Sequence, residues 1–238
     1  LHLLSRRQRQ MCIRDRYVES DMMKSALQRR DFENAVVMYN FKELEPLTES
    51  DVEYPKSEPY KLCTFSRVMK EKGIEDAINA VESVNAHFGR TVYTLDIFGQ
   101  VDVEYKERFS QLEKSFPDYI SYGGAIEANK SVETLKSYFA LLFPTYYKGE
   151  GFAGTLIDAM SAGVPVIASD WKYNPEFVVP GKTGVIIKNC NAERLDEELI
   201  NIAAAPEKWN SMRLSALKES EKYKPDIAAR PLIDRING

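Results

Sequence analysis

The chain has 238 residues, of which 44% are hydrophobic and 29% are charged, and its formal net charge at pH 7 is −4. This composition excludes disordered, collagen-like and coiled-coil proteins and indicates a soluble globular chain. Its apolar runs are far shorter than the ~20 residues that cross a bilayer, so we predict no membrane-spanning helix, whereas peripheral membrane contact stays open. Three separated cysteines and two histidines are poor material for a Cys/His metal site, and they fit a reducing cytoplasm.

The first 16 residues differ from the rest of the chain. They carry five arginines and one aspartate, so residues 17–238 hold 27 basic and 35 acidic side chains, a net charge of −8. That negative charge argues against nucleic-acid binding by the body of the protein. Because residues 1–16 have no periodic apolar face, we predict a non-native or disordered tail that does not contribute to folding. A basic arm for anionic lipid or nucleic acid is the alternative.

From residue 17 onward, the apolar spacing switches repeatedly between helix and strand. Ser20 and Asp21 can cap a helix that ends near residue 30, and a short strand follows at 34–39. The polar, proline-containing stretch 43–59 is predicted to be a linker. Beyond it we predict strand 60–66, helix 74–87, strand 91–98, helix 103–116, strand 119–122, helix 130–138, strand 140–144, helix 154–162, strand 164–168, strand 184–187, and helices 192–204 and 206–222.

This alternation predicts an α/β fold. Strands that alternate with helices of this length favour right-handed βαβ crossovers and a Rossmann-like parallel sheet with helices on both faces. Continuous apolar runs such as 140–143 and 164–168 suit strands that are covered on both faces. Ligands of such sheets bind beyond the carboxyl ends of the strands, so the loops that follow the strands are where we expect a site.

The loop after the first strand of this sheet is rich in cations. Residues 66–73 read SRVMKEKG and place Arg67 and Lys72 beside the start of a helix, whose first amides lack partners. Such an environment suits a phosphate group. A solvated turn closed by Gly73 explains the same residues equally well.

The loop after strand 140–144 combines glycines with two carboxylates. Its sequence over residues 148–155 is KGEGFAGT, whose glycines let the backbone approach a ligand closely. Glu150 precedes the next helix and Asp158 lies about one turn inside it, so both can border one pocket. There they could accept hydrogen bonds from the hydroxyls of a sugar or a ribose. As ordinary charges, Asp158 would be an exposed helix residue and Glu150 a favourable charge near a helix N-terminus.

Several motifs together resemble a known family. The run PTYYKGEGFAGTLIDAMSAGVPVIASD, preceded by FSRVMKEKG and followed by NPEFVVPGKTGVIIK, resembles the nucleotide-sugar-binding half of GT-B glycosyltransferases, particularly the retaining glycosyltransferase family 4. The Arg/Lys loop, the E-x7-E element, the AGVPVIASD strand and the PGKTG turn follow in the order of that family. The resemblance implies a nucleotide-sugar-binding domain over 51–223, a remnant of the amino-terminal acceptor domain and hinge over 17–50, and a carboxyl-terminal helix over 224–238.

The resemblance also implies a role for each site residue. In that family the Arg/Lys loop holds the donor diphosphate, which implies Arg67 and Lys72. The first acid of E-x7-E lies against the donor sugar, which implies Glu150 as the catalytic residue. The second acid holds the ribose, which implies Asp158, although aspartate here replaces glutamate and is one methylene shorter. The amides of Phe152, Ala153, Gly154 and Thr155 would complete the diphosphate cradle, and Gly124, Ala125 and Ile126 would lie near the base.

The activity implied is retaining transfer of a hexose-type sugar from a nucleoside diphosphate sugar to a glycan or lipid-linked acceptor, as in polysaccharide biosynthesis. No metal and no further cofactor is expected, and the chain has no DxD triplet for the metal-dependent GT-A arrangement. Because that family binds its acceptor on an amino-terminal domain, we expect a fragment that is inactive alone, located in the cytoplasm or at the inner face of the membrane. A GT-B sugar-nucleotide 2-epimerase and a noncatalytic nucleotide-sugar-binding module remain as alternatives.

Overall fold

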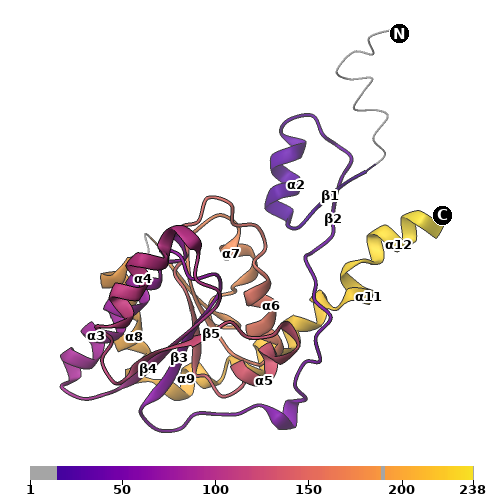
Figure 1. Ribbon diagram of the computed structural model, residues 1–238. Helices are drawn as coiled ribbons and strands as arrows, with labels where there is room; N and C mark the ends of the chain where they lie inside the picture. The colour runs from indigo at the N-terminus through magenta and orange to yellow at the C-terminus, as the bar shows by residue number, and fades with distance from the viewer. Residues whose placement is uncertain (1–14, 189–190, 238) are drawn as a thin grey trace.

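The structure is a computed structural model that describes residues 15–188 and 191–237. Its centre is a parallel six-stranded sheet with the strand order β5-β4-β3-β6-β7-β8 (Figure 1). The order reverses between β3 and β6, which is where ligands bind in open α/β sheets. The predicted Rossmann-like α/β fold is thereby confirmed. In chain order the strands are β3 (Tyr60–Phe65), β4 (Tyr93–Phe98), β5 (Ile120–Gly124), β6 (Ala140–Phe143), β7 (Val166–Ser169) and β8 (Gly184–Ile187).

Helices cover both faces of the sheet (Figure 1). On one face lie α3 (Ile74–Phe88), α4 (Lys106–Glu113) and α8 (Ala192–Ala204), and on the other lie α5 (Ser131–Leu135), α6 (Gly154–Ser161), α7 (Asn174–Phe177) and α10 (Arg213–Ser220). Short 3-10 helices η2 (Lys70–Lys72), η3 (Val103–Tyr105) and η4 (Ala128–Lys130) precede α3, α4 and α5. Each face has its own apolar core. Leu142 belongs to one and Leu141 to the other, because successive strand residues point to opposite faces, which explains the uninterrupted apolar run of β6.

A small unit precedes this sheet. Strands β1 (Arg16–Val18) and β2 (Ala35–Val37) pair in parallel and are connected through α2 (Asp21–Gln28), which Ser20 caps by accepting the amide of Met23. The expected tail falls mostly on residues 1–14, which lie outside the described residues. Its predicted end at residue 16 is wrong, because Arg16 belongs to β1 and Asp15 pairs with Arg235 at 2.8 Å. A strand of three residues is too short to show a period in the sequence.

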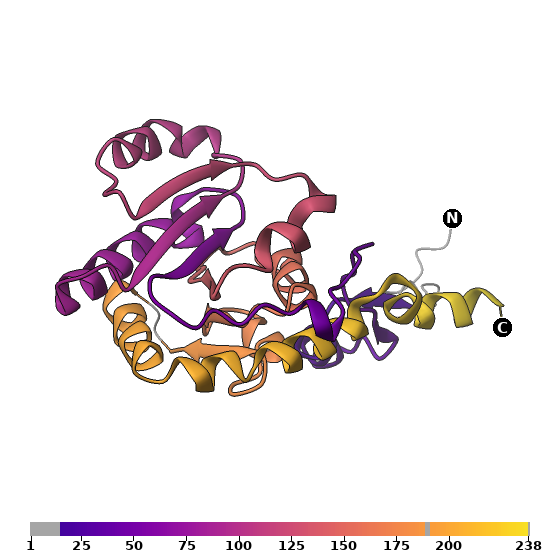
Figure 2. The same ribbon diagram turned by 90° about the horizontal axis from the view of Figure 1, so that it is seen from below.

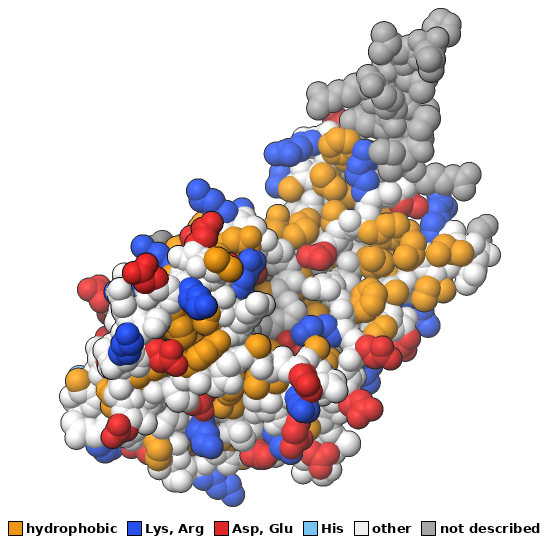
Figure 3. Space-filling view, in the orientation of Figure 1, with side chains coloured by type: hydrophobic (Ala, Val, Ile, Leu, Met, Phe, Trp, Pro, Cys, Tyr) orange, Lys and Arg blue, Asp and Glu red, His pale blue; other side chains and the backbone are white. Residues whose placement is uncertain are grey.

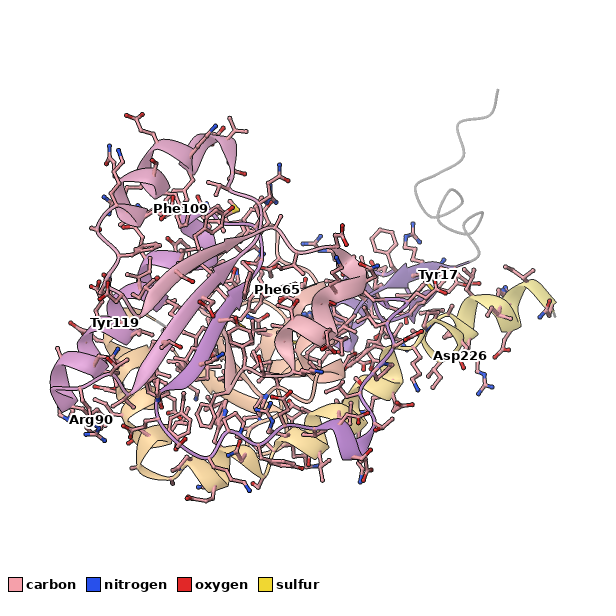
Figure 4. The ribbon with its side chains drawn as sticks, turned by 60° about the horizontal axis from the view of Figure 1, so that its bottom comes forward. Tyr17, Phe65, Arg90, Phe109, Tyr119 and Asp226 are labelled. Carbon is pink, nitrogen blue, oxygen red and sulfur yellow. The ribbon has the colours of Figure 1, made fainter. Side chains whose placement is uncertain are left out.

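The segment from residue 38 to residue 59 connects this unit to β3 and contains η1 (Glu49–Asp51). It passes along the side of the sheet that carries α5 and α6, as Figure 4 shows, where Tyr17 marks the small unit and Phe65 marks the end of β3. The segment has little regular secondary structure, as expected of the predicted linker. It nevertheless reaches the carboxyl end of the sheet.

The chain ends in a series of short helices that returns to the small unit (Figure 2). The predicted helix 206–222 is broken into α9 (Pro206–Asn210), α10 and η5 (Glu221–Tyr223), and α11 (Pro225–Ala228) and α12 (Arg230–Asn237) follow. Hydrophobic side chains gather on the surface over the small unit and these last helices (Figure 3). The exposed large hydrophobic side chains of these elements include Met22, Ile227, Ile233 and Ile236. Among the described residues, no helix has both the length and the apolar character to span a membrane.

Candidate functional site

A cavity of about 340 Å³ lies beyond the carboxyl ends of β3, β4 and β5, next to the point where the strand order reverses. Phe65, labelled in Figure 4 at the end of β3, is one of the residues that line it. The structure brings eight of the predicted site residues together around this cavity: Lys72, Ala125, Ile126, Glu150, Ala153, Gly154, Thr155 and Asp158. Further lining residues are Lys42, Phe65, Ser66, Phe98, Gly99 and Gln100.

The first charged group in the cavity is the pair of Glu150 and Lys72. The ammonium of Lys72 donates to both carboxylate oxygens, at 2.9 Å to Oε1 and 2.7 Å to Oε2, and Thr145 Oγ1 donates to Oε2 at 2.7 Å. The side chains of Lys72 and Glu150 are only 10% and 6% exposed. Charges that are this deeply buried require partners, so the pair holds both groups in position.

The chain around Lys72 explains why its side chain reaches Glu150. Lys72 ends η2, and the following Gly73 has φ 73°, in the left-handed region that favours glycine. A Cβ at Gly73 would lie 2.4 Å from the carbonyl oxygen of Pro144, so only glycine allows η2 to pack this closely against the end of β6. That contact brings Lys72 next to the loop that carries Glu150.

The second charged group centres on Asp158, whose side chain is 1% exposed. Ser131 donates to its Oδ1 at 2.8 Å, and the ammonium of Lys42 donates to its Oδ2 at 2.6 Å. Burial raises the pKa of Asp158 above its ordinary value, while the charge and hydrogen bond of Lys42 and the hydrogen bond of Ser131 oppose that shift. Asp158 is therefore not an exposed helix residue, and that interpretation is wrong.

The third feature of the cavity is the beginning of α6, whose first amides have no partners within the helix. Gly154 is the first helical residue, and both it and Thr155 line the cavity. The hydroxyl of Thr155 is buried and has no hydrogen-bond partner among the described residues. A helix N-terminus with its glycine and an unsatisfied hydroxyl favours an anionic ligand at this place.

Three predicted site residues do not line the cavity. Phe152 directs its amide to Glu19 of the small unit, at 3.1 Å from Oε2, and its ring stacks on Phe177 with centroids 3.6 Å apart. Arg67 is 52% exposed and lies 3.4 Å from Asp102. Gly124 ends β5, where its carbonyl accepts the amide of Gly99 at 2.8 Å. All three flank residues that do line it.

Sequence reasoning did not find the contribution of the first 50 residues to this site. Lys42 reaches Asp158 across 116 positions of sequence, and Glu19 reaches the amide of Phe152 across 133. Asn40 adds a bond from its Nδ2 to the carbonyl of Phe152 at 3.0 Å. Lys42 stands in a polar stretch with acidic neighbours, so no local pattern distinguishes it from a solvated lysine. Its only available signal was its place just after a strand, where loops line α/β sites.

Comparisons with known proteins identify the family of the chain. Residues 48–219 match the family model described as glycosyl transferases group 1. The GtfA subunit of the UDP-N-acetylglucosamine–peptide N-acetylglucosaminyltransferase of Streptococcus gordonii is 31% identical over 150 residues, which are 62% of this chain and 28% of that protein. The poly(glycerol-phosphate) alpha-glucosyltransferase of Bacillus subtilis is 26% identical over 183 residues, 75% of this chain and 26% of that protein.

Solved structures share the fold. HepE of Anabaena, in complex with UDP and glucose, superposes with a TM-score of 0.77 at 15% identity and covers 94% of this chain and 63% of its own. The pneumococcal O-GlcNAc transferase GtfA, in complex with UDP and GlcNAc, has a TM-score of 0.72 at 20% identity and covers 94% and 45%. The segments matched in the Streptococcus gordonii and Bacillus subtilis proteins are less than a third of the length of those proteins. With a GT-B Rossmann-like sheet and a family match over most of its length, the chain belongs to the group 1 glycosyl transferases.

Proposed function

We propose that the chain is the donor-binding half of a retaining glycosyltransferase of family 4, which transfers a hexose-type sugar from a nucleoside diphosphate sugar to a glycan or lipid-linked acceptor. The observation that carries the proposal is one cavity bordered by Lys72 with Glu150, by Asp158 and by the beginning of α6. A nucleoside diphosphate sugar presents a matching series of groups: hydroxyls on the sugar, a diphosphate, and hydroxyls on the ribose.

Each group of the cavity then has a task in the transfer. Negative charge develops on the departing diphosphate, and Lys72 and the amides at the start of α6 would stabilise it. Arg67, one residue beyond the lining residue Ser66, would add a further cation when its exposed side chain turns to the ligand. Glu150 would orient the sugar, and Asp158 would hold the ribose. That this charge is stabilised without a metal stays a prediction.

The relatives support the donor class more than the acceptor. Two of the superposed structures hold UDP, with glucose in one and GlcNAc in the other. The acceptors named for the curated relatives differ, since one is a peptide and another is poly(glycerol phosphate). The acceptor of this chain is therefore proposed only as a class. We place its binding site outside the donor-binding half.

Calorimetry on the 238-residue chain tests the donor site. One of uridine, guanosine and adenosine diphosphate should bind weakly, and the chain alone should turn nothing over. Arg67→Ala and Lys72→Ala should each weaken that binding by about 1–3 kcal/mol, the usual cost of a lost charge-assisted hydrogen bond. Lys182→Ala, which removes an exposed lysine outside the cavity, is the matched control. If none of the three nucleotides binds at millimolar concentration to the folded chain, the proposed donor site is wrong.

Product analysis with the complete enzyme tests the reaction. Free nucleoside diphosphate together with a glycosylated acceptor of unchanged anomeric configuration would support retaining transfer. An isomerised donor would indicate a sugar-nucleotide epimerase instead. Neither product would indicate a binding module.

A further inference from the structure

The proposed ribose contact of Asp158 is blocked by another residue of this chain. Ser131 holds Oδ1 and Lys42 holds Oδ2, and 1% of the side chain is exposed. A ribose hydroxyl can bond only to an oxygen that it can reach. A nucleotide therefore has to displace one of the two residues that already bond to Asp158.

Lys42 is the partner that can leave. Its side chain is 32% exposed, and it stands in the segment 38–59, whose only regular structure is η1. Ser131 is fully buried at the beginning of α5, and its hydroxyl oxygen also lies 3.0 Å from the carbonyl oxygen of Ala128, which shares the single hydroxyl proton with Asp158. A lysine on a flexible four-carbon stem changes partner more readily than a buried serine.

The displaced ammonium would stay next to the beginning of α6. The Cε and Nζ atoms of Lys42 lie 3.2 and 3.6 Å from the place that a Cβ on Gly154 would take. The unsatisfied hydroxyl of Thr155 belongs to the same turn. A diphosphate held by the amides of this turn would meet the ammonium of Lys42 after only a rotation of its side chain.

We propose that Lys42 exchanges partners when the donor binds: it leaves Asp158, its partner in this structure, and pairs with the donor diphosphate. This inference rests on the proposed function and adds a residue to it. The exchange frees Asp158 for the ribose and brings a further cation to the leaving group. The exchange also makes the site prefer ligands that carry a diphosphate. A ligand with a diphosphate gives the displaced ammonium a new partner. A nucleoside also breaks the pair of Lys42 and Asp158 but offers the ammonium no new partner.

The test compares a nucleoside with its own diphosphate. Both are titrated by NMR into the 238-residue chain at pH 8, with the base that binds best among uracil, guanine and adenine. Lys42→Met keeps most of the length of the side chain and removes the charge. We expect this variant to bind the nucleoside diphosphate about tenfold more weakly, which is the effect of one lost charge-assisted hydrogen bond. The affinity for the nucleoside should stay equal or increase, since no ammonium has to be displaced.

Three further variants separate this exchange from a general effect on the fold. Lys42→Gln also removes the charge but can still donate to Asp158. It replaces Lys42→Met if that variant folds poorly, and it should show the same loss of preference for the diphosphate. Lys42→Arg keeps the charge and should retain the preference. Lys182→Met removes an exposed charge outside the cavity and should leave both affinities unchanged.

Two results would overturn the inference in distinguishable ways. If Lys42→Met and Lys42→Gln weaken nucleoside and diphosphate by the same factor, Lys42 only shapes the cavity, while the proposed function stands because the wild-type chain still binds the diphosphate. If the folded wild-type chain binds no nucleoside diphosphate, the proposed function fails and this inference fails with it.

Discussion

Glu150 and Asp158 lie in one cavity, and each has a lysine and a hydroxyl as partners, but the two groups are built differently. Lys72 ends η2, which follows β3, and Glu150 and Thr145 lie in the loop that follows β6. Asp158 takes its lysine from the segment before the sheet. The first group is held by adjacent strands of one sheet, whereas the second depends on how a largely irregular segment lies over α6. We infer that the first is the rigid part of the site and the second the exchangeable part.

The largest expected effect concerns turnover in the complete enzyme. Glu150→Gln keeps the shape of the side chain but removes the charge proposed to lie beside the sugar, so turnover should fall by about 100-fold or more while nucleotide affinity stays nearly intact. Asp158→Ala should raise KM more than it lowers kcat, because ribose contacts act on ground state and transition state alike. Glu193→Gln on α8, an exposed position, is the control for steady-state kinetics. Unchanged kinetics in both site variants would show that these carboxylates take no part in transfer.

The aspartate that replaces the family's glutamate can be examined in the same assay. Asp158→Glu should be tolerated if α6 can shift by about the length of one methylene, and harmful if the cavity has closed around aspartate. With Ser131 and Lys42 both bonded to Asp158 within 2.8 Å, we expect a rise in KM rather than a gain. A KM equal to that of the wild type would instead show that the second group is loosely packed.

Urea unfolding measures how much each of the two pairs contributes to the free energy of unfolding, and we expect the more rigid pair to contribute more. Lys72→Met leaves Glu150 buried without a cation and should lower the free energy of unfolding by about 3–5 kcal/mol. Lys42→Met should cost only about 1–2 kcal/mol, because Lys42 is 32% exposed and water that enters where its ammonium stood can solvate the carboxylate of Asp158. The double variant Lys72→Met/Glu150→Met should recover most of the loss, since it leaves no charge unpaired. Equal losses in the two single variants would contradict a difference in rigidity between the groups.

Removing the hydroxyls should have smaller effects. Thr145→Val and Ser131→Ala each delete one hydrogen bond to a buried carboxylate and should cost about 1–2 kcal/mol. Thr145→Val should be the more damaging, because Thr145 Oγ1 also accepts the amide of Tyr147 at 3.2 Å, which then loses its partner. Thermal unfolding of the two variants decides the order, and the reverse order would mean that the Asp158 group is the more tightly held.

The smallest effect is a dependence of stability on pH. Because the pKa of Asp158 is raised in the folded chain, the unfolded chain releases this proton first as the pH rises above its ordinary value of 3.8. The contribution of Asp158 to the free energy of unfolding is therefore full below that pH and is lost as the pH rises through the raised pKa. Asp158→Asn has no such proton, so the difference between variant and wild type should move in favour of the variant from pH 4 to pH 7. A constant difference in urea unfolding would contradict a raised pKa.

Much of the fold could be predicted because buried apolar residues recur in the sequence with the period of a helix or a strand. The six strands of the main sheet and the helices between them were expected close to their observed places, since each must cover an apolar face. The errors fall on short elements. β1 and α7 have three and four residues, and α9 and α10 are separated by a break that the apolar spacing does not mark.

The candidate site divides in the same way. Eight predicted residues line the cavity because they follow strands whose carboxyl ends meet at one edge of the sheet. The roles assigned to them remain predictions. The exposure of Asp158 could not be read from the sequence, because a carboxylate on a short helix has the same local pattern whether it is buried or solvated.

The sequence by itself determined the order of strands and helices, the parallel sheet and the loops that form its binding edge, because these follow from where apolar residues and glycines recur. Only the tertiary structure decided which charges meet there. Lys42 and Glu19 reach the site across 116 and 133 positions, and contacts between such distant residues depend on how the segments pack. The approach of Lys42 to Asp158 is therefore a property of the folded chain, because a lysine in a polar stretch carries no local sign of its partner.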